Sequence, residues 1–204
     1  MKIYLARHGQ DQDNANKILN GRRDEPLTDL GVQQALALAE RIKETGLHFE
    51  AVYASPLQRT FKTAEIISEA SAQPAPIADE DIVERDFGIM TGQPISKIEE
   101  MCAPNIIKAE IITYFLTPDG GESFPDLLVR AHRAIDAFAV RHAGQSILLV
   151  THGDVGKMLY AAYYHLPWEQ VLTDFHFGNS ELLLLSEDSP ASETHVFKVE
   201  QHNH

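Results

Sequence analysis

Two short segments of the sequence place a histidine shortly after a run of apolar residues. Residues 3–6 lead into Arg7 and His8, and residues 147–150 lead, through one threonine, into His152. A short apolar run of this kind is typical of a strand that is buried on both faces. Ligands of open parallel α/β sheets bind beyond the carboxyl ends of the strands. We therefore expect His8 and His152 to reach one site at the end of a sheet.

The side chains expected at this site suit the transfer of a phosphoryl group. The planar fork of an arginine donates two parallel hydrogen bonds to phosphate oxygens, and Arg7 and Arg59, which both follow strands, are candidates for this role. A neutral imidazole can accept a phosphoryl group on nitrogen, which makes His8 the candidate nucleophile. His152 would stabilise the developing charge. Glu84 would protonate the leaving alcohol and then activate water.

Each of these assignments has a simpler alternative when it is taken alone. A single histidine is more often structural than catalytic. Arg59 is expected in the first turn of a helix, where a solvated side chain without a role is an equally good interpretation. However, a cation in that turn opposes the helix dipole, and a residue placed against its local preference favours a function. The prediction of phosphoryl transfer therefore depends on the combination of residues.

The composition is typical of a soluble α/β protein without a basic surface. The 204 residues fit one domain, and their formal net charge of -13 argues against binding to nucleic acid or to an anionic membrane. No apolar run reaches the ~20 residues that span a bilayer, and Arg7 and His8 interrupt the first one too early for a signal peptide. Cys102 is the only cysteine, so a reducing, cytoplasmic location is expected.

Periodicity predicts an alternation of helices and strands along the chain. The expected helices cover 28–45, 55–67, 124–141 and 155–163, and the expected strands after the first cover 49–54, 76–78, 146–151, 182–185 and 195–199. Thr28 and Ser55 are the expected N-caps, the latter with Pro56 at the first helical position. We expect a single domain over 1–204 with a cap-like insertion at about 86–123.

Six motifs in this order resemble the histidine phosphatase superfamily, the phosphoglycerate mutase-like proteins. They are Arg7-His8-Gly9 with Asn14, Pro26-Leu27-Thr28 with Gly31, Ser55-Pro56-Leu57 with Arg59, Glu84 with Phe87-Gly88, Gly121-Glu122-Ser123, and Thr151-His152-Gly153. The similarity runs from residue 3 to about residue 181. It implies a three-layer α/β/α sandwich around a mostly parallel sheet.

The resemblance also implies roles for the same side chains. It makes His8 the phosphohistidine nucleophile, assigns the phosphate pocket to Arg7, Arg59 and His152, and makes Glu84 the proton donor.

Further residues are candidates for binding the substrate. Asn14 and Gly153 match positions that line the pocket in relatives, and Gly21, in the loop after the first strand, is a further candidate. No metal or organic cofactor is expected. The expected partner is a small phosphorylated substrate, and a homodimer is compatible with the sequence.

Two departures from the family pattern concern the substrate. Asp11 stands where relatives often carry threonine, and Met90-Thr91 replaces a Trp-Glu pair. Both are expected near the entrance of the pocket, where an acidic residue would disfavour a second phosphate. Sugar phosphates, phosphoglycerates and ribazole phosphate stay open as substrates, and the candidate contacts for their carbon part are Tyr114, Phe115 and Phe124.

Hydrolysis of a phosphomonoester is the preferred activity. The mutases of the family are longer, which makes mutase-type phosphoryl transfer the second choice. A binder of phosphorylated ligands without turnover would be expected to lack His8 or Glu84, and both are present. The other histidines are expected at the surface, among them His48, His132, His142, His165 and His176. His202 and His204 are expected in a terminal tail.

Overall fold

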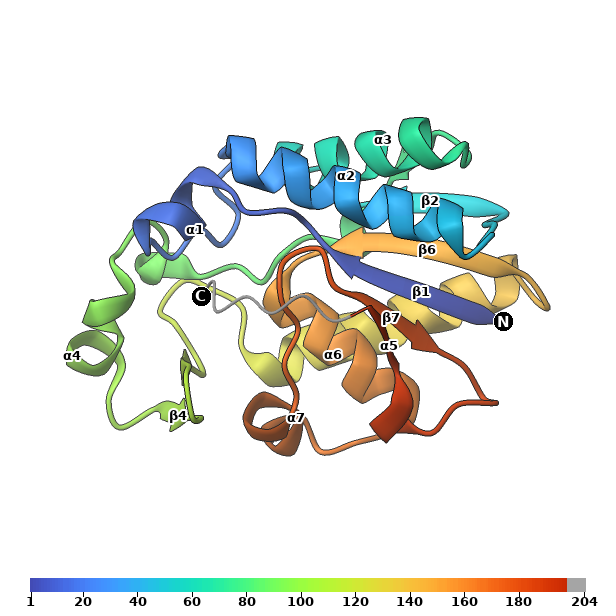
Figure 1. Ribbon diagram of the computed structural model, residues 1–204. Coiled ribbons are helices and arrows are strands. Elements are labelled where there is room, and N and C mark those ends of the chain that lie inside the picture. Colours follow the sequence, from blue (N-terminus) through green and yellow to red (C-terminus); the bar gives the residue numbers. More distant parts are fainter. Residues whose placement is uncertain (198–204) are drawn as a thin grey trace.

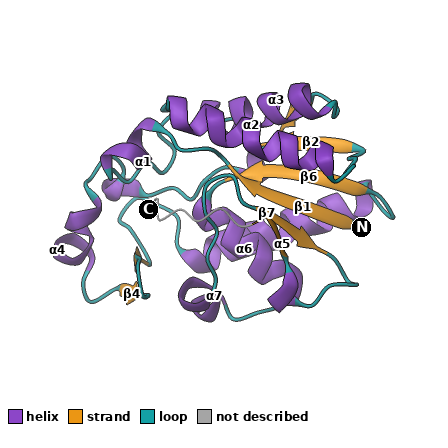
Figure 2. Ribbon diagram, viewed as in Figure 1, coloured by secondary structure: helices purple, strands orange, loops and turns teal. Residues whose placement is uncertain are grey.

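A six-stranded sheet runs through the middle of the molecule (Figures 1 and 2). The computed structural model describes residues 1–197. The strands are β1 (Lys2–Arg7), β2 (Ala51–Ala54), β3 (Pro76–Ala78), β6 (Ser146–Thr151), β7 (Leu182–Leu185) and β8 (His195–Phe197). Their order across the sheet is β3-β2-β6-β1-β7-β8. The first four of these are parallel, whereas β7 is antiparallel to β1, and β8 to β7.

Helices cover both faces of this sheet and complete a three-layer α/β/α sandwich. In Figure 1, α2 (Asp29–Glu44) and α3 (Gln58–Ser71) lie above the sheet, and α5 (Phe124–Arg141) and α6 (Gly153–Tyr164) lie below it. The strands are apolar on both sides because each face is covered by helices. This arrangement confirms the predicted fold class.

The register of the sheet brings the two predicted catalytic segments together. β1 and β6 are adjacent and parallel, and Arg7 at the end of β1 pairs with Thr151 at the end of β6. The backbone N–H of His8 donates to the carbonyl of Thr151 at 3.0 Å. His8 and His152 therefore leave the sheet at the same edge, as the sequence pattern predicts.

The helix N-termini agree only in part with the prediction. The Thr28 hydroxyl accepts a hydrogen bond from the N–H of Gly31 at 3.1 Å, so Thr28 is the N-cap of α2. The prediction that Ser55 caps the next helix is wrong, because α3 begins at Gln58 and follows an extended Leu57. The Ser55 hydroxyl instead contacts His152, at 2.8 Å from Nε2. The first backbone N–H of α3, that of Gln58, instead donates to the Asp24 carboxylate at 2.6 Å.

The segment between β3 and α5 projects beyond the carboxyl end of β1 (Figure 1). It contains α4 (Ile98–Cys102) and the hairpin of β4 (Ile106–Lys108) and β5 (Thr113–Phe115). It has its own apolar cluster, which includes Met90 with an exposed fraction of 0%. Met90 is therefore buried behind the cavity wall and does not itself line the cavity.

Two short helices complete the structure: α1 (Gln12–Asn16) follows β1, and α7 (Trp168–Asp174), which the sequence analysis does not predict, follows α6. The last predicted strand is present as β8, but Val199 lies outside the described residues, as do His202 and His204.

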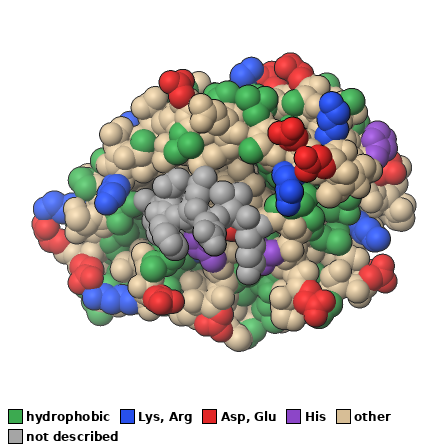
Figure 3. All heavy atoms as spheres, in the orientation of Figure 1, with side chains coloured by type: hydrophobic (Ala, Val, Ile, Leu, Met, Phe, Trp, Pro, Cys, Tyr) green, Lys and Arg blue, Asp and Glu red, His purple; other side chains and the backbone are tan. Residues whose placement is uncertain are grey.

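The surface is mixed in charge. On the face shown in Figure 3, Lys and Arg side chains lie scattered among Asp and Glu side chains. His142 is not at the surface as predicted, because it is 8% exposed and its Nε2 lies 2.9 Å from the Tyr53 hydroxyl. No helix within residues 1–197 has the length and apolar character needed to cross a membrane.

Candidate active site

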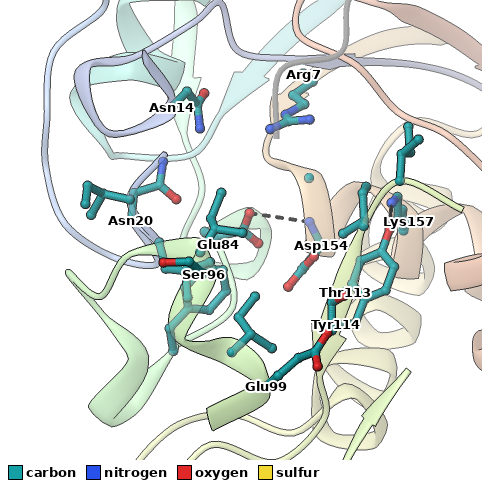
Figure 4. A pocket seen from close by; sticks show the side chains of 18 of the residues that line it. Arg7, Asn14, Asn20, Glu84, Ser96, Glu99, Thr113, Tyr114, Asp154 and Lys157 are labelled. Atoms are coloured by element: carbon teal, nitrogen blue, oxygen red, sulfur yellow. Dashed lines mark hydrogen bonds between the residues drawn. The ribbon is translucent and has the colours of Figure 1, made fainter. Parts of the chain in front are cut away.

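A cavity of about 560 Å³ opens beyond the carboxyl ends of β1 and β6. Four of the predicted site residues line it: Arg7, Asn14, Glu84 and Gly153. Figure 4 shows Arg7 and Asn14 at one end of the cavity and Glu99 at the other, with Glu84 between them. The predicted residues His8, Arg59 and His152 do not line the cavity and are at most 2% exposed, although Arg7 and Gly153, the chain neighbours of the two histidines, do line it.

His8 is held in one tautomer. Its Nδ1 lies 2.7 Å from the carbonyl oxygen of Gly9. Because a carbonyl oxygen only accepts hydrogen bonds, Nδ1 must carry the proton and Nε2 keeps its lone pair. Nε2 has no hydrogen-bond partner among residues 1–197. Burial and the charges of Arg59 and Arg7 lower the pKa of His8 well below its ordinary value, so the ring is neutral at neutral pH.

His152 packs edge-on against His8, with the ring centroids 5.1 Å apart. Arg59 Nε donates to Nδ1 of His152 at 3.2 Å, so the proton of this ring lies on Nε2 and points to the Ser55 hydroxyl. Burial, followed by the charge of Arg59, lowers the pKa of His152 well below its ordinary value. Both ring nitrogens of His152 are therefore engaged by the protein.

Arg59 is a fully buried cation beneath these two rings. Its terminal nitrogens donate to the carbonyls of Arg23 at 2.6 Å and Gly21 at 2.8 Å. Its Nε also lies 3.3 Å from a carboxylate oxygen of Asp11. A guanidinium has five donors, so some remain for a ligand, but the fork as a whole is fixed by the protein. Direct contact of Arg59 with a phosphate group therefore stays a prediction.

Asp11 is a buried counter-ion and not an entrance residue, which corrects the expectation from the sequence. Its exposed fraction is 0%, and it accepts hydrogen bonds from the backbone N–H of Asn14 and the side chain of Asn20, both at 2.7 Å. Burial raises the pKa of Asp11 more than Arg59 lowers it. Asp11 thus ties the loop after β1 to Arg59. Asp11 is therefore not placed to repel a second phosphate at the entrance.

Arg7 presents an unsatisfied donor at the cavity. One terminal nitrogen donates to the carbonyl of Phe177 at 2.9 Å, while the buried Nε has no hydrogen-bond partner among residues 1–197. A buried donor without a partner is costly, and the guanidinium that carries it lines the cavity, where its charge favours an anion. Gly153 lies directly against this guanidinium, since a Cβ atom there would come within 3.5 Å of it. Gly153 also begins α6, whose positive N-terminal end favours anions.

Glu84 is buried beside the first turn of α6, the helix that begins at Gly153. One carboxylate oxygen accepts from the backbone N–H of Arg85 at 2.8 Å and of Val155 at 3.2 Å. Burial and the nearby carboxylate of Asp154 raise the pKa of Glu84, although the backbone donors act in the opposite direction. A carboxyl group with a raised pKa is suited to give up a proton near neutral pH.

The remaining predicted residues differ in whether they line the cavity. Gly21 does not line the cavity, and its part is to hold Arg59 through its carbonyl. Tyr114 lines the cavity, whereas Phe115 and Phe124 are 3% and 0% exposed and belong to apolar clusters. Among residues 1–197, no group of three or more His, Cys, Asp or Glu side chains is arranged to hold a metal ion.

The sequence analysis missed several residues that support the site. The Asn179 amide donates to the backbone carbonyl of His8 at 2.8 Å and approaches the Asn14 side chain at 3.4 Å. Arg85 is fully buried and holds the carboxylate of Asp154 at 2.8 Å. The signals for them were weak: Asn179 follows a glycine before a predicted strand, and Arg85 follows Glu84 directly.

Comparison with known proteins decides the family. The family model for the histidine phosphatase superfamily (branch 1) matches residues 3–197. The chain belongs to the histidine phosphatase superfamily. Phosphoglycerate mutase-like protein 4 of Arabidopsis thaliana is 37% identical over 164 residues, which make up 78% of this chain and 69% of the relative. Three further curated relatives are longer, and the chain spans 43% of their length.

Solved histidine phosphatase structures are similar over nearly the whole chain. Bacillus stearothermophilus YhfR is 29% identical with a TM-score of 0.77, covering 98% of this chain and 96% of its own. The mycobacterial glucosyl-3-phosphoglycerate phosphatase Rv2419c, in its complex with VO3, is 25% identical with a TM-score of 0.78 and covers 91% and 92%. The superfamily includes both phosphatases and phosphoglycerate mutase-like proteins, so membership leaves the reaction to be argued from the site.

Proposed function

We propose that this histidine phosphatase hydrolyses a phosphomonoester of a small metabolite through a phosphohistidine on His8. The observation that carries the proposal is the state of the His8 ring. Its Nδ1–H is fixed on the Gly9 carbonyl at 2.7 Å, Nε2 keeps its lone pair, and the ring lies within the influence of the charges of Arg59 and Arg7. A neutral, oriented imidazole next to a cationic anion site is what attack on a phosphate ester requires.

In the first step, Nε2 of His8 attacks phosphorus and the ester P–O bond breaks. Arg7 and the N-terminus of α6 stabilise the charge on the phosphoryl oxygens. The proton of the Glu84 carboxyl group passes to the leaving oxygen, so the product leaves as an alcohol. Glu84 is then a carboxylate, held by the backbone N–H groups of Arg85 and Val155.

In the second step, water attacks phosphorus and the P–N bond to His8 breaks. Glu84 accepts a proton from the attacking water and regains its starting form. The buried charge of Arg59 favours the neutral His8 as a leaving group because it disfavours the protonated ring. The products are inorganic phosphate and the free enzyme, in which Glu84 is protonated and His8 is neutral again.

The comparisons support both hydrolysis and the mutase alternative. The similar mycobacterial structure is named as a glucosyl-3-phosphoglycerate phosphatase, whereas the Arabidopsis relative is named as phosphoglycerate mutase-like. A mutase must return the phosphoryl group to a bound intermediate and exclude water. We place hydrolysis first because the cavity of about 560 Å³ leaves room for water beside a small substrate.

The test is phosphate release from a panel of sugar, glycerate and nucleoside monophosphates. Wild-type protein should hydrolyse at least one of them, and His8→Ala should lose turnover by about 1,000-fold or more because no nucleophile remains. His48→Ala, which changes an exposed histidine, is the matched control and should keep full activity.

Full activity of His8→Ala would remove His8 as the nucleophile. Silence of the folded wild-type protein across the panel, with transfer between phosphoglycerates instead, would establish the mutase. Silence in both assays with tight binding of phosphorylated ligands would indicate a non-catalytic binder.

A further inference from the structure

One wall of the cavity carries a buried lysine for which the proposed mechanism has no use. Lys157 lines the cavity, although its side chain is only 3% exposed. Gly153 and Lys157 are four residues apart on α6 and therefore lie on the same face of the helix, and both line the cavity. Figure 4 shows Lys157 next to Tyr114, on the side of the cavity where Asp154 lies.

The ammonium of Lys157 has a neutral partner. It donates to the hydroxyl of Tyr114, and its nitrogen lies 4.7 Å from the centroid of that ring. A lysine ammonium has three donors, so two remain for a ligand. None of the ion pairs found within residues 1–197 includes Lys157.

The acidic groups near Lys157 are occupied by other partners. Asp154 forms its ion pair with Arg85 at 2.8 Å, and Glu84 and Glu181 accept backbone hydrogen bonds. Arg85 is fixed in turn by the rings of Phe87, Phe115 and Phe124, whose centroids lie 4.2 to 4.9 Å from its guanidinium carbon. The Asp154 carboxylate is therefore turned to Arg85.

A buried lysine without its own counter-ion is unfavourable. Burial, only partly offset by the charge of Asp154, lowers the pKa of Lys157 to about 8, and Arg7 acts in the same direction as burial. Lysine is almost never fully buried unless it is paired. An anion bound in the cavity would supply the missing partner and favour the charged form.

We propose that Lys157 determines specificity by binding a carboxylate on the leaving group of the substrate, with Tyr114 holding the ammonium in place. This inference rests on the proposed phosphomonoester hydrolysis and names the class of ester. A single ammonium matches the charge of a carboxylate. A second phosphate carries about two charges and calls for an arginine fork or several cations, which this wall does not offer among the described residues.

The position of Lys157 also limits the size of the leaving group. Gly153, beside the phosphate end of the cavity, and Lys157 are separated by one turn of α6, which is about 6 Å along the helix axis. The carboxylate therefore belongs within a few bonds of the ester oxygen. Small phosphorylated carboxylic acids meet this condition.

The test compares esters that differ only in this charge. The pairs are phosphoglycolate with phosphoglycolamide, and 4-carboxyphenyl phosphate with 4-carbamoylphenyl phosphate, in which a neutral amide replaces the carboxylate at nearly the same shape. Wild-type protein should prefer the carboxylate of at least one pair by about tenfold to a hundredfold in kcat/KM, as expected for a buried hydrogen bond between charged groups.

Lys157→Met should abolish that preference, because kcat/KM should fall by about tenfold to a hundredfold for the carboxylate and by far less for the amide. Tyr114→Phe should reduce the preference several-fold, because the ammonium loses its fixed partner. Lys62→Met is the matched control, since Lys62 is exposed on α3 and pairs with Glu65, and it should keep the full preference.

Each outcome separates the two proposals. Equal hydrolysis of carboxylate and amide by wild-type protein would overturn the role of Lys157 while the proposed function stands. An equal loss on both esters in Lys157→Met would also overturn it, since a purely structural lysine predicts that result. If Lys157→Met does not fold, the wild-type preference and its reduction in Tyr114→Phe decide. Absence of hydrolysis of every ester would overturn the proposed function, and the Lys157 site with it.

Discussion

Glu84 occupies surroundings that suit both of its proposed roles. It is 4% exposed, and burial together with the charge of Asp154 raises its pKa, which favours the protonated acid needed in the first step. The N–H groups of Arg85 and Val155 stabilise the carboxylate that the first step produces. A single side chain can therefore alternate between acid and base.

Replacing Glu84 by Gln should affect esters according to their leaving groups. Alkyl phosphates need a proton on the departing oxygen, so their kcat/KM should fall by about 100-fold to 10,000-fold. Aryl phosphates leave without this proton, and their kcat/KM should stay within about tenfold of wild type. The measurement is kcat/KM for a series of esters of graded leaving-group pKa. Equal losses across the series would show that Glu84 acts elsewhere.

The sequence identifies those site residues whose position follows from the strand that precedes them. His8 and His152 each follow an apolar run at the end of a strand, and parallel pairing then brings them together. Asp11 was misplaced because its role depends on a contact with Arg59, which lies far along the chain. Lys157 gave no signal, because its burial beside Tyr114 depends on how the segment containing β5 packs on α6.

At the scale of elements, the first turn of α6 lies between Arg7, which is proposed to bind phosphate, and Glu84, the proposed acid. Gly153 lies against Arg7, and the N–H groups of Asp154 and Val155 lie near the Glu84 carboxylate. Arg85 holds Asp154 and is itself stacked among three phenylalanine rings. Two of these rings, Phe87 and Phe115, come from the segment between β3 and α5. That segment therefore helps to fix the charge beside Glu84.

Asp154→Asn should move the pH profile of the reaction. Glu84 must be protonated to act as the acid, and the negative charge of Asp154 is one of the causes that raise its pKa. Without that charge the pKa of Glu84 falls, so the loss of kcat/KM at high pH should begin at a lower pH. The measurement is the pH dependence of kcat/KM for an alkyl phosphate, on which protonation of the leaving group is required.

The control for this shift is Asp136→Asn, which removes an exposed carboxylate on α5 and should leave the profile unchanged. If kcat/KM of Asp154→Asn began to fall at the same pH as in wild type, or at a higher pH, the assigned effect of Asp154 on the pKa of Glu84 would be contradicted. Aryl phosphates should show little change in either variant, because they do not need the acid.

Element boundaries were predicted where a local signal decides them. Thr28 and Ser123 cap α2 and α5 with their own side chains, and the sequence placed both helices within a residue or two. The start of α3 was placed too early: the Ser55 hydroxyl contacts His152, and the first N–H of the helix donates to the Asp24 carboxylate. Both contacts join segments that are far apart in the chain, and no local pattern reports them.

At the scale of the whole molecule, the fold brings three cations to one cavity of an acidic protein. The formal net charge is -13, yet Arg7, Arg59 and Lys157 all lie at or beside the one cavity described above. The fold makes this possible because parallel strands end at a common edge, and α6 begins there. The mostly parallel sheet and the two helical layers followed from the sequence pattern and the family resemblance, whereas the order of the strands did not.

The central claim is that His8 carries the phosphoryl group during turnover. In the most direct measurement, the protein is mixed with an aryl phosphate that is radiolabelled in its phosphoryl group. The reaction is quenched in alkali within the first turnover, and the labelled peptide is mapped. The label should lie on the peptide that contains His8, and it should accumulate in Glu84→Gln, where activation of water is slow. Turnover without labelled protein, or undiminished label in His8→Ala, would contradict the account.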